Sequence, residues 1–154
     1  MTEATVLGLA IGPEGSSMPI HREARDSVNL VEGKGVEGDK KFGKSVGRQV
    51  NLVSQRSYDW FERNFGRPRD LPGGMGENIV ISSEIDPSWL DLGQRIRVGE
   101  AVLEVVTPRS PCERFTETVE GIKISHFVGH VGLMCAVVKS GAVKVGDKAV
   151  LEDE

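Results

Sequence analysis

Short segments in which polar and apolar residues alternate recur along most of this chain, and they constrain its fold more than any other feature. The clearest case is a predicted hairpin, in which residues 95–98 and 101–106 alternate on both sides of Gly99-Glu100, a two-residue turn that begins with glycine. Comparable short strands are predicted at residues 4–11, 27–31, 48–53, 78–81, 133–138 and 149–151. Glycine accounts for 19 of the 154 residues, which suits the many turns that short strands need.

Helical patterns are fewer. An amphipathic helix is predicted from its N-cap, Ser54, to about Phe65, with Tyr58 and Phe61 on the same apolar face as Phe65. Shorter helical turns are expected within residues 85–92 and 113–125. Because strands dominate and long β-α-β alternation is missing, we predict a mainly all-β fold: a mostly antiparallel β-barrel with one or two peripheral helices. The length fits a single domain over residues 1–154.

Composition excludes several classes of protein. Hydrophobic residues make up 38% and charged residues 27%, as in ordinary globular chains. The longest apolar runs fall far short of the ~18 residues that cross a membrane, and no basic segment precedes the first apolar stretch, so no secretory signal is expected. Two cysteines cannot build a disulfide framework. We therefore expect a cytoplasmic protein with no membrane partner.

Charge is spread unevenly along the chain. Residues 33–69 contain nine basic and four acidic residues, whereas the remainder contains ten basic and nineteen acidic ones. A basic segment in an otherwise acidic chain suits a small anionic ligand better than a nucleic acid, whose binders usually present a broadly basic surface. A solvated loop and helix face would account for the same charges.

The basic segment contains two phosphate-loop patterns. Residues 38–45 match G-x-x-x-x-G-K-S, and residues 33–38 match G-x-G-x-x-G. Either pattern binds phosphate only where a buried strand precedes it and a helix follows it. Here the next predicted element is a strand, so a nucleotide-binding P-loop is the weakest of the functions considered.

Two cysteines and two histidines raise the question of metal binding. Cys112 and Cys135 with His126 and His130 supply the atoms of a zinc site, but no closely spaced cysteine pair nucleates it, and Cys135 lies in an apolar strand. Cys112 differs because it follows a strand, within Pro108-Arg109-Ser110-Pro111-Cys112-Glu113-Arg114. Neighbouring arginines favour the thiolate, which is the form that binds metals. A loop cysteine without function is the simpler alternative.

The order of several motifs resembles the MOSC domain family, named for the C-terminal domain of molybdenum-cofactor sulfurase. The motifs that carry the resemblance are Gly35-Val36-Glu37-Gly38-Asp39, residues 48–54 (RQVNLVS), residues 72–79 (PGGMGENI), residues 92–99 (LGQRIRVG) and Pro108-Arg109-Ser110-Pro111-Cys112. The likeness spans about residues 6–150. It implies a β-barrel, in agreement with the strand pattern.

The resemblance also implies a cofactor and a chemistry. Family members bind molybdenum cofactor, and in relatives that reduce N-hydroxylated compounds the family cysteine, here Cys112, is a ligand of molybdenum. This position makes Cys112 the expected catalytic residue and metal ligand, since a thiolate is a soft donor. The expected cofactor-binding residues are Lys40, Lys41, Arg48, Asn78 and Arg109.

The leading hypothesis is therefore a molybdenum-dependent oxidoreductase that acts on a small N-hydroxylated substrate and receives electrons from a redox partner protein. The alternative is a non-catalytic sulfur carrier or cofactor-delivery module that holds a persulfide on Cys112. Many relatives have a histidine where this chain has Lys40-Lys41-Phe42, so no proton-transfer role of that histidine carries over. Larger relatives add an N-terminal barrel domain, and a homodimer is one way to cover the face that this domain would occupy.

Overall fold

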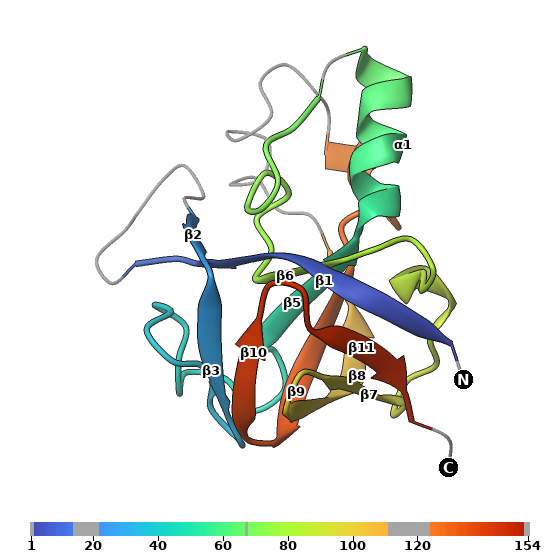
Figure 1. The fold of residues 1–154 in the computed structure, drawn as a ribbon. Helices are drawn as coiled ribbons and strands as arrows, with labels where there is room; N and C mark the ends of the chain where they lie inside the picture. The colour runs from blue at the N-terminus through green and yellow to red at the C-terminus, as the bar shows by residue number, and fades with distance from the viewer. Residues whose placement is uncertain (1, 14–21, 67, 111–123, 153–154) are drawn as a thin grey trace.

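The structure, a computed structural model, describes residues 2–13, 22–66, 68–110 and 124–152. Strands dominate these residues, and a single α-helix accompanies them (Figure 1). In chain order the described elements are β1 (Glu3–Ile11), β2 (Glu23–Arg25), β3 (Ser27–Val31), β4 (Gly35–Val36), β5 (Val50–Ser54), α1 (Gln55–Phe65), β6 (Ile79–Ile81), the 3₁₀ helix η1 (Pro87–Trp89), β7 (Arg95–Val98), β8 (Ala101–Pro108), the 3₁₀ helix η2 (Ile124–Phe127), β9 (Leu133–Lys139), β10 (Gly141–Lys144) and β11 (Lys148–Leu151).

Seven strands close into a barrel. Their order is β11-β7-β8-β9-β5-β6-β1, and β1 pairs back onto β11 through Glu3–Val150 and Ala4–Ala149. The short strand β2 extends the sheet from the other end of β1, and β10, β3 and β4 form a second, three-stranded sheet beside the barrel. The predicted β-barrel is confirmed. Closure leaves few unpaired strand edges in the wall.

One pair of neighbouring strands departs from the antiparallel pattern. β5 and β6 run parallel, with Leu52 opposite Ile79. Parallel neighbours need a crossover connection, and α1 supplies it on the outside of the barrel (Figure 1). The chain therefore contains one β-α-β unit that the sequence patterns do not predict.

The helix begins and ends where the sequence predicts. The Ser54 side chain accepts a hydrogen bond from the Arg56 backbone N–H at 3.2 Å, and Gly66 ends the helix in a left-handed conformation. Tyr58 and Phe61 are buried on one face. Together with Phe127 and Met75 they form a small core between α1 and the outer wall of the barrel, separate from the main core inside it.

The burial of β5 differs from the prediction. Its alternating sequence predicts a half-buried strand, but every residue from Val50 to Ser54 is buried. Val50 and Leu52 point into the barrel, whereas Val53 belongs to the core beneath α1. The outer face of β5 is thus covered by protein, and Asn51 lies on that covered face.

No helix in the described part of the chain is long and apolar enough to cross a membrane.

Candidate functional site

A cavity of about 130 Å³ lies against the outer face of the barrel, where β5 and β9 pair and where β6 begins. Its lining residues come from every part of the chain: Arg22, Lys40, Lys41, Arg48, Gln49, Asn51, Asn78, Arg109, Ser110 and Met134. Asn51 and Met134, which both line the cavity, are directly opposite each other in the β5–β9 ladder.

The cavity brings together all five residues predicted to bind the cofactor. Lys40 and Lys41 lie in the turns after β4, Arg48 precedes β5, Asn78 precedes β6, and Arg109 follows β8. They span about seventy positions of sequence, so their meeting is a consequence of the barrel and not of local sequence. Whether they bind a cofactor stays a prediction.

Asp39 fixes the lysine-containing turns to the rest of the site. Its buried carboxylate accepts hydrogen bonds from the Gly12 backbone N–H (2.7 Å) and from the Lys41 backbone N–H (3.0 Å). It also accepts from the Arg22 guanidinium (2.6 Å) and the Asn78 amide (3.3 Å). Neither Arg22 nor this role of Asp39 was predicted. The Gly38-Asp39 pair was the available signal for Asp39, whereas Arg22 stands in no motif.

Asn78 lies on the cavity wall, but its side chain mainly joins segments of the fold. Its Nδ2 group donates to the Ala10 carbonyl (3.1 Å) as well as to Asp39, and its Oδ1 atom accepts from the Asn51 backbone N–H (3.1 Å). These bonds tie β1, β5 and the turn at Asp39 together. In the described structure Asn78 is therefore a positioning residue.

Two more side chains anchor the loops around the cavity. Gln49 donates to the carbonyls of Ser45 (3.1 Å) and Val46 (2.8 Å), and its Oε1 atom accepts from the Val137 backbone N–H (3.0 Å). Arg109 donates to the Met75 carbonyl at 2.5 Å. Two residues of the cavity lining are therefore held by hydrogen bonds to distant parts of the fold.

The electrostatics of the cavity favour an anion. Five cationic side chains line it, and the Asp39 carboxylate pairs with one of them, Arg22. The pKa of Lys41 lies below its ordinary value, first because its ammonium is partly removed from water and then because of the charges on Arg22, Arg109 and Lys40; Asp39 opposes the shift. A bound anion would relieve this mutual repulsion, and lysine and arginine donors suit phosphate or carboxylate oxygens.

Of the two cysteines, the structure describes only one. Cys112 lies outside the described residues, and in the sequence it follows the cavity residue Ser110 by two positions. Cys135 lies inside the barrel, and burial raises its pKa to about 12. It is therefore inaccessible as a ligand to the zinc site considered above, and the described residues hold no cluster of three His, Cys, Asp or Glu side chains.

The P-loop pattern does not adopt the required fold. Residues 38–45 form successive turns, the next strand is β5, and α1 begins only at Gln55. The helix N-terminus that would face a phosphate is absent from the end of this loop. Both glycines of the pattern, Gly38 and Gly43, instead have positive φ angles of 89° and 73°, which glycine adopts readily.

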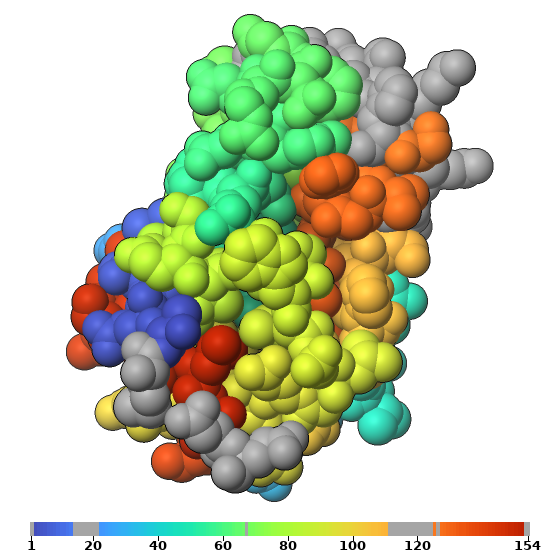
Figure 2. Space-filling model, turned by 90° about the vertical axis from the view of Figure 1, so that its right-hand side faces the viewer, coloured from blue at the N-terminus to red at the C-terminus, as the bar shows by residue number. Residues whose placement is uncertain are grey.

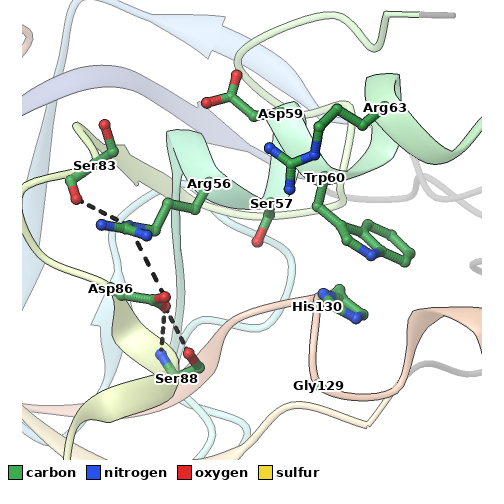
Figure 3. A pocket seen from close by; sticks show the side chains of 10 residues that line it. All are labelled: Arg56, Ser57, Asp59, Trp60, Arg63, Ser83, Asp86, Ser88, Gly129 and His130. Atoms are coloured by element: carbon green, nitrogen blue, oxygen red, sulfur yellow. Dashed lines mark hydrogen bonds and ion pairs between the residues drawn. The ribbon is translucent and has the colours of Figure 1, made fainter. Parts of the chain in front are cut away.

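A larger, more open cavity of about 460 Å³ lies beside α1 (Figure 3). Figure 2 shows this side of the molecule, with α1 and the segment after residue 124 next to each other above the barrel. Several residues that line it contact one another: Arg56 donates to the Ser83 carbonyl, Asp86 accepts from Ser88, and the ring centroids of Trp60 and His130 stack 3.8 Å apart. None of the five residues predicted to bind the cofactor lines this cavity.

The sequence of this chain is similar to those of known proteins. A family model described as the MOSC domain matches residues 39–150. YiiM of Escherichia coli is 28% identical over 149 residues, which cover 91% of this chain and 65% of YiiM. YuaD of Bacillus subtilis, whose name suggests a role in metal-sulfur cluster biosynthesis, is 28% identical over 142 residues, or 74% of each chain.

Solved structures agree with this match at the level of the fold. The crystal structure of Bacillus subtilis YuaD superposes with a TM-score of 0.84 at 24% identity and covers 99% of this chain and 97% of YuaD. The crystal structure of Escherichia coli YiiM gives a TM-score of 0.69 at 23% identity, over 96% of this chain and 70% of YiiM. Likenesses at this identity concern the barrel alone.

Proposed function

This chain belongs to the MOSC domain family, and from that membership we propose that it binds molybdenum cofactor at the cationic cavity and reduces small N-hydroxylated compounds. The observation that carries the proposal is the convergence of Lys40, Lys41, Arg48 and Arg109 on one cavity, beside the segment that leads to Cys112.

The residues present suit the chemistry of the cofactor. Its phosphate is an anion, and the cavity supplies lysine and arginine donors for one. Its pterin carries polar N–H and carbonyl groups, and the cavity lining includes the amide residues Gln49, Asn51 and Asn78. A cavity of about 130 Å³ is smaller than the ~300–1,000 Å³ usual for a whole ligand, so we assign it to one end of the cofactor.

Each group of the chain then has a task. The cations bind and orient the anionic end, Asn78 and Asp39 hold the walls in register, and the Cys112 thiolate would be the soft ligand of the metal. When bound, the cofactor supplies a molybdenum centre that removes oxygen from the substrate. The overall change is R₂N–OH + 2 e⁻ + 2 H⁺ → R₂NH + H₂O.

The two electrons must come from outside the chain. Two cysteines do not suffice for the four thiolates of a usual iron–sulfur cluster, and one of them, Cys135, is sealed in the barrel. We therefore propose an external redox partner protein as the electron donor.

The alternative is a sulfur carrier in which the Cys112 thiolate attacks the outer sulfur of a donor persulfide, so that Cys112 becomes the persulfide and the donor leaves as its thiolate. The name of YuaD, which refers to metal-sulfur cluster biosynthesis, is the observation that favours it. A carrier needs the same accessible thiolate but no bound metal, so the two functions differ in what is attached to Cys112.

The test is elemental analysis and intact mass of protein made in a host that synthesises the cofactor. We expect close to one molybdenum per chain, and loss of the metal in Cys112→Ser but not in the matched control Cys135→Ala, whose thiol faces the barrel interior. A sulfur adduct on Cys112 without molybdenum would establish the carrier instead. Undiminished molybdenum in Cys112→Ser would refute the assigned metal ligand.

A further inference from the structure

The open cavity of about 460 Å³ beside α1 has a lining rich in polar side chains (Figure 3). Three segments form it: the side of α1, the residues around η1, and the turn that contains Gly129 and His130. Figure 2 shows where these segments meet on the surface. Arg56, Arg63 and Gly129 are among the lining residues that are exposed. A dissolved molecule can therefore reach the walls of this cavity.

An apolar cavity of about 200 Å³ adjoins the polar one. Four residues line both cavities, which therefore form one groove with a polar and an apolar lobe: Ser57, Asp86, Ser88 and Gly129. The rest of the apolar lobe is lined by Pro87, Leu90, Leu92, Pro108, Gly132 and Leu133. A cavity of ~150 Å³ already accommodates benzene, so the apolar lobe of this α1 groove has room for one aromatic ring.

The polar lobe contains hydrogen-bond donors without a protein partner. Arg63 makes no hydrogen bond or ion pair among the described residues, although Asp59 precedes it by one helical turn. Figure 3 shows its guanidinium turned into the cavity, toward Ser57. The Ser57 hydroxyl likewise bonds to no described residue. Arg56 donates its Nε–H to the Ser83 carbonyl at 3.0 Å, so the other four N–H groups of its guanidinium stay available.

The carboxylates of the polar lobe are already occupied in part. Asp86 Oδ1 accepts from the Ser88 N–H (3.0 Å) and from the Ser88 hydroxyl (2.7 Å), and Asp86 Oδ2 lies 3.9 Å from Arg56 Nε. Asp59 Oδ1 accepts from the Gln55 amide at 3.0 Å. The two arginines and two aspartates of the lobe balance in formal charge, but the groups left to bind a ligand are mainly donors.

An aromatic pair forms a further wall of the polar lobe. The rings of Trp60 and His130 stack with their planes 7° apart, and Phe127 packs edge-on against Trp60. Burial lowers the pKa of His130 below its ordinary value, and Asp86 opposes the shift. The imidazole is therefore mainly neutral above pH 7, where it supplies one N–H donor and no charge. The attraction for a charged ligand then comes from the arginines.

We propose that the α1 groove is a second binding site, which takes a small carboxylate with an apolar body. Arg63 donates to the carboxylate together with the Ser57 hydroxyl, Arg56 adds to the positive potential, and the apolar body occupies the neighbouring lobe. Arginine suits this task because its planar donors can bind both oxygens of a carboxylate. Since Ser57 lines both lobes, a carboxylate beside it lies next to the apolar lobe. The site is independent of what the cationic cavity binds.

Three small molecules of related shape test the chemistry of the site. 3-Phenylpropionate has both a ring and a carboxylate, propionate lacks the ring, and 3-phenylpropylamine carries an ammonium group in place of the carboxylate. In chemical-shift titrations of the wild-type protein at pH 7.5, we expect 3-phenylpropionate to bind at least about 10-fold more tightly than either of the others. The net charge of the chain is −4, so non-specific attraction would favour the amine instead.

Three results with the wild-type protein would overturn the proposal. Equal binding of propionate would show that the apolar lobe is not used. Equal or tighter binding of the amine would show that the site does not select a carboxylate. Absence of saturable binding of 3-phenylpropionate up to about 10 mM, the range expected for a ligand of this size, would show that the groove is not a site.

Arg63→Gln locates the carboxylate. Arg63 is an exposed residue in the last turn of α1, so the variant should fold, and its affinity for 3-phenylpropionate should fall about 5-fold. The cationic cavity is the competing location for an anion, and Arg48→Gln removes a cation from its lining. The affinity for 3-phenylpropionate should persist in Arg48→Gln. An affinity unchanged in Arg63→Gln would overturn the proposal, and a loss confined to Arg48→Gln would place the ligand in the cationic cavity instead.

Leu92→Ser locates the apolar body. Leu92 lines the apolar lobe and is 67% exposed, so its replacement should leave the fold intact. We expect 3-phenylpropionate to bind about 2- to 5-fold more weakly, whereas the affinity for propionate should not change. An unchanged affinity for 3-phenylpropionate would mean that its ring lies elsewhere and would refute the assignment of the apolar lobe.

Discussion

The guanidinium of Arg22 and the carboxylate of Asp39 form an ion pair of 2.6 Å in which both side chains are almost completely buried, at 5% and 3% exposure. Asp39 thereby balances one of the five cations around the cavity. Since the same carboxylate also bonds two backbone N–H groups and Asn78, it links the lysine-containing turns to β1 and to the start of β6.

Asp39→Ala should therefore destabilise the protein strongly. Removal of one partner of a buried pair leaves the other charge without compensation, which typically costs about 3–5 kcal/mol. The measurement is the free energy of unfolding in urea. Glu23→Ala is the matched control, because the Arg25–Glu23 pair (3.2 Å) is 41% and 44% exposed and such pairs contribute at most about 1 kcal/mol. Equal costs for the two variants would show that the Arg22–Asp39 pair is not a structural link.

Anion binding to the cavity should weaken as pH rises. Repulsion and partial burial lower the pKa of Lys41 in the free protein, and a bound anion raises it again. Affinity is then constant below the pKa of the free state and falls between the pKa values of the free and bound states. Sulfate is the probe, because its own charge does not change between pH 6 and about pH 10.

The Lys41→Arg variant isolates this effect. Arginine keeps its charge at every pH in this range, so sulfate affinity should lose most of its pH dependence. Lys34→Arg, an exposed lysine of the same basic segment that does not line the cavity, is the control and should behave like the wild type. A pH profile unchanged in Lys41→Arg would contradict the assignment.

Local sequence patterns predicted the ends of the helix and the tight turn of the hairpin, because a few neighbouring residues determine these features. Ser54 and Gly66 delimit α1 as expected, and Gly99, with a φ angle of 58°, begins the β7–β8 turn as a glycine-first turn requires. The β10 strand was missed because Gly141 indicates a turn, whereas its strand character comes from pairing with β3. The parallel β5–β6 pair was missed for the same reason, since strand partners are set by tertiary contacts.

The site residues also divide into those that sequence motifs predict and those whose role depends on tertiary contacts. The basic turns and Arg109 were recognisable from motifs, and the barrel brings them together. Arg22 was not recognisable, because its importance comes from the distant Asp39 that accepts its hydrogen bond. Asn51 was quoted within a motif, but its place on the covered outer face of β5 is visible only once the strand register is known.

Tyr58→Phe should reveal how firmly the loop beside the cavity is held. The Tyr58 hydroxyl donates to the fully buried carboxylate of Glu77 at 2.7 Å, and Glu77 also accepts from the backbone N–H groups of Gly73 and Met75. A hydrogen bond to a charged group contributes about 1.5–3 kcal/mol. We expect that loss in the free energy of unfolding, measured in urea at pH 7.

The stability difference between the wild type and Tyr58→Phe should also depend on pH, in a direction set by the pKa of Tyr58. Burial and the nearby Glu77 raise the pKa of Tyr58 in the native state. Above the ordinary pKa near 10 the unfolded chain releases this proton while the native chain retains it, so stability falls as pH rises. The difference in stability between wild type and Tyr58→Phe should therefore shrink above about pH 10. A constant difference across that range would show that Tyr58 titrates normally.

The two cysteines should differ sharply in reactivity, and the difference decides which of them is available for chemistry. In Cys112→Ser the remaining thiol, Cys135, lies inside the barrel with its pKa raised to about 12. Since the thiolate is the reactive form, Ellman's reagent at pH 8 should find no thiol in the folded variant and one after unfolding in urea. In Cys135→Ala the remaining Cys112 follows the cavity residues Arg109 and Ser110 along the chain, and it should react in the folded state.

Bound molybdenum or a persulfide would protect Cys112, so the metal-free, reduced protein must be used. Rapid reaction of folded Cys112→Ser would mean that the barrel opens readily, and an unreactive Cys112 in Cys135→Ala would remove the accessible thiolate on which both the oxidoreductase and the sulfur carrier depend.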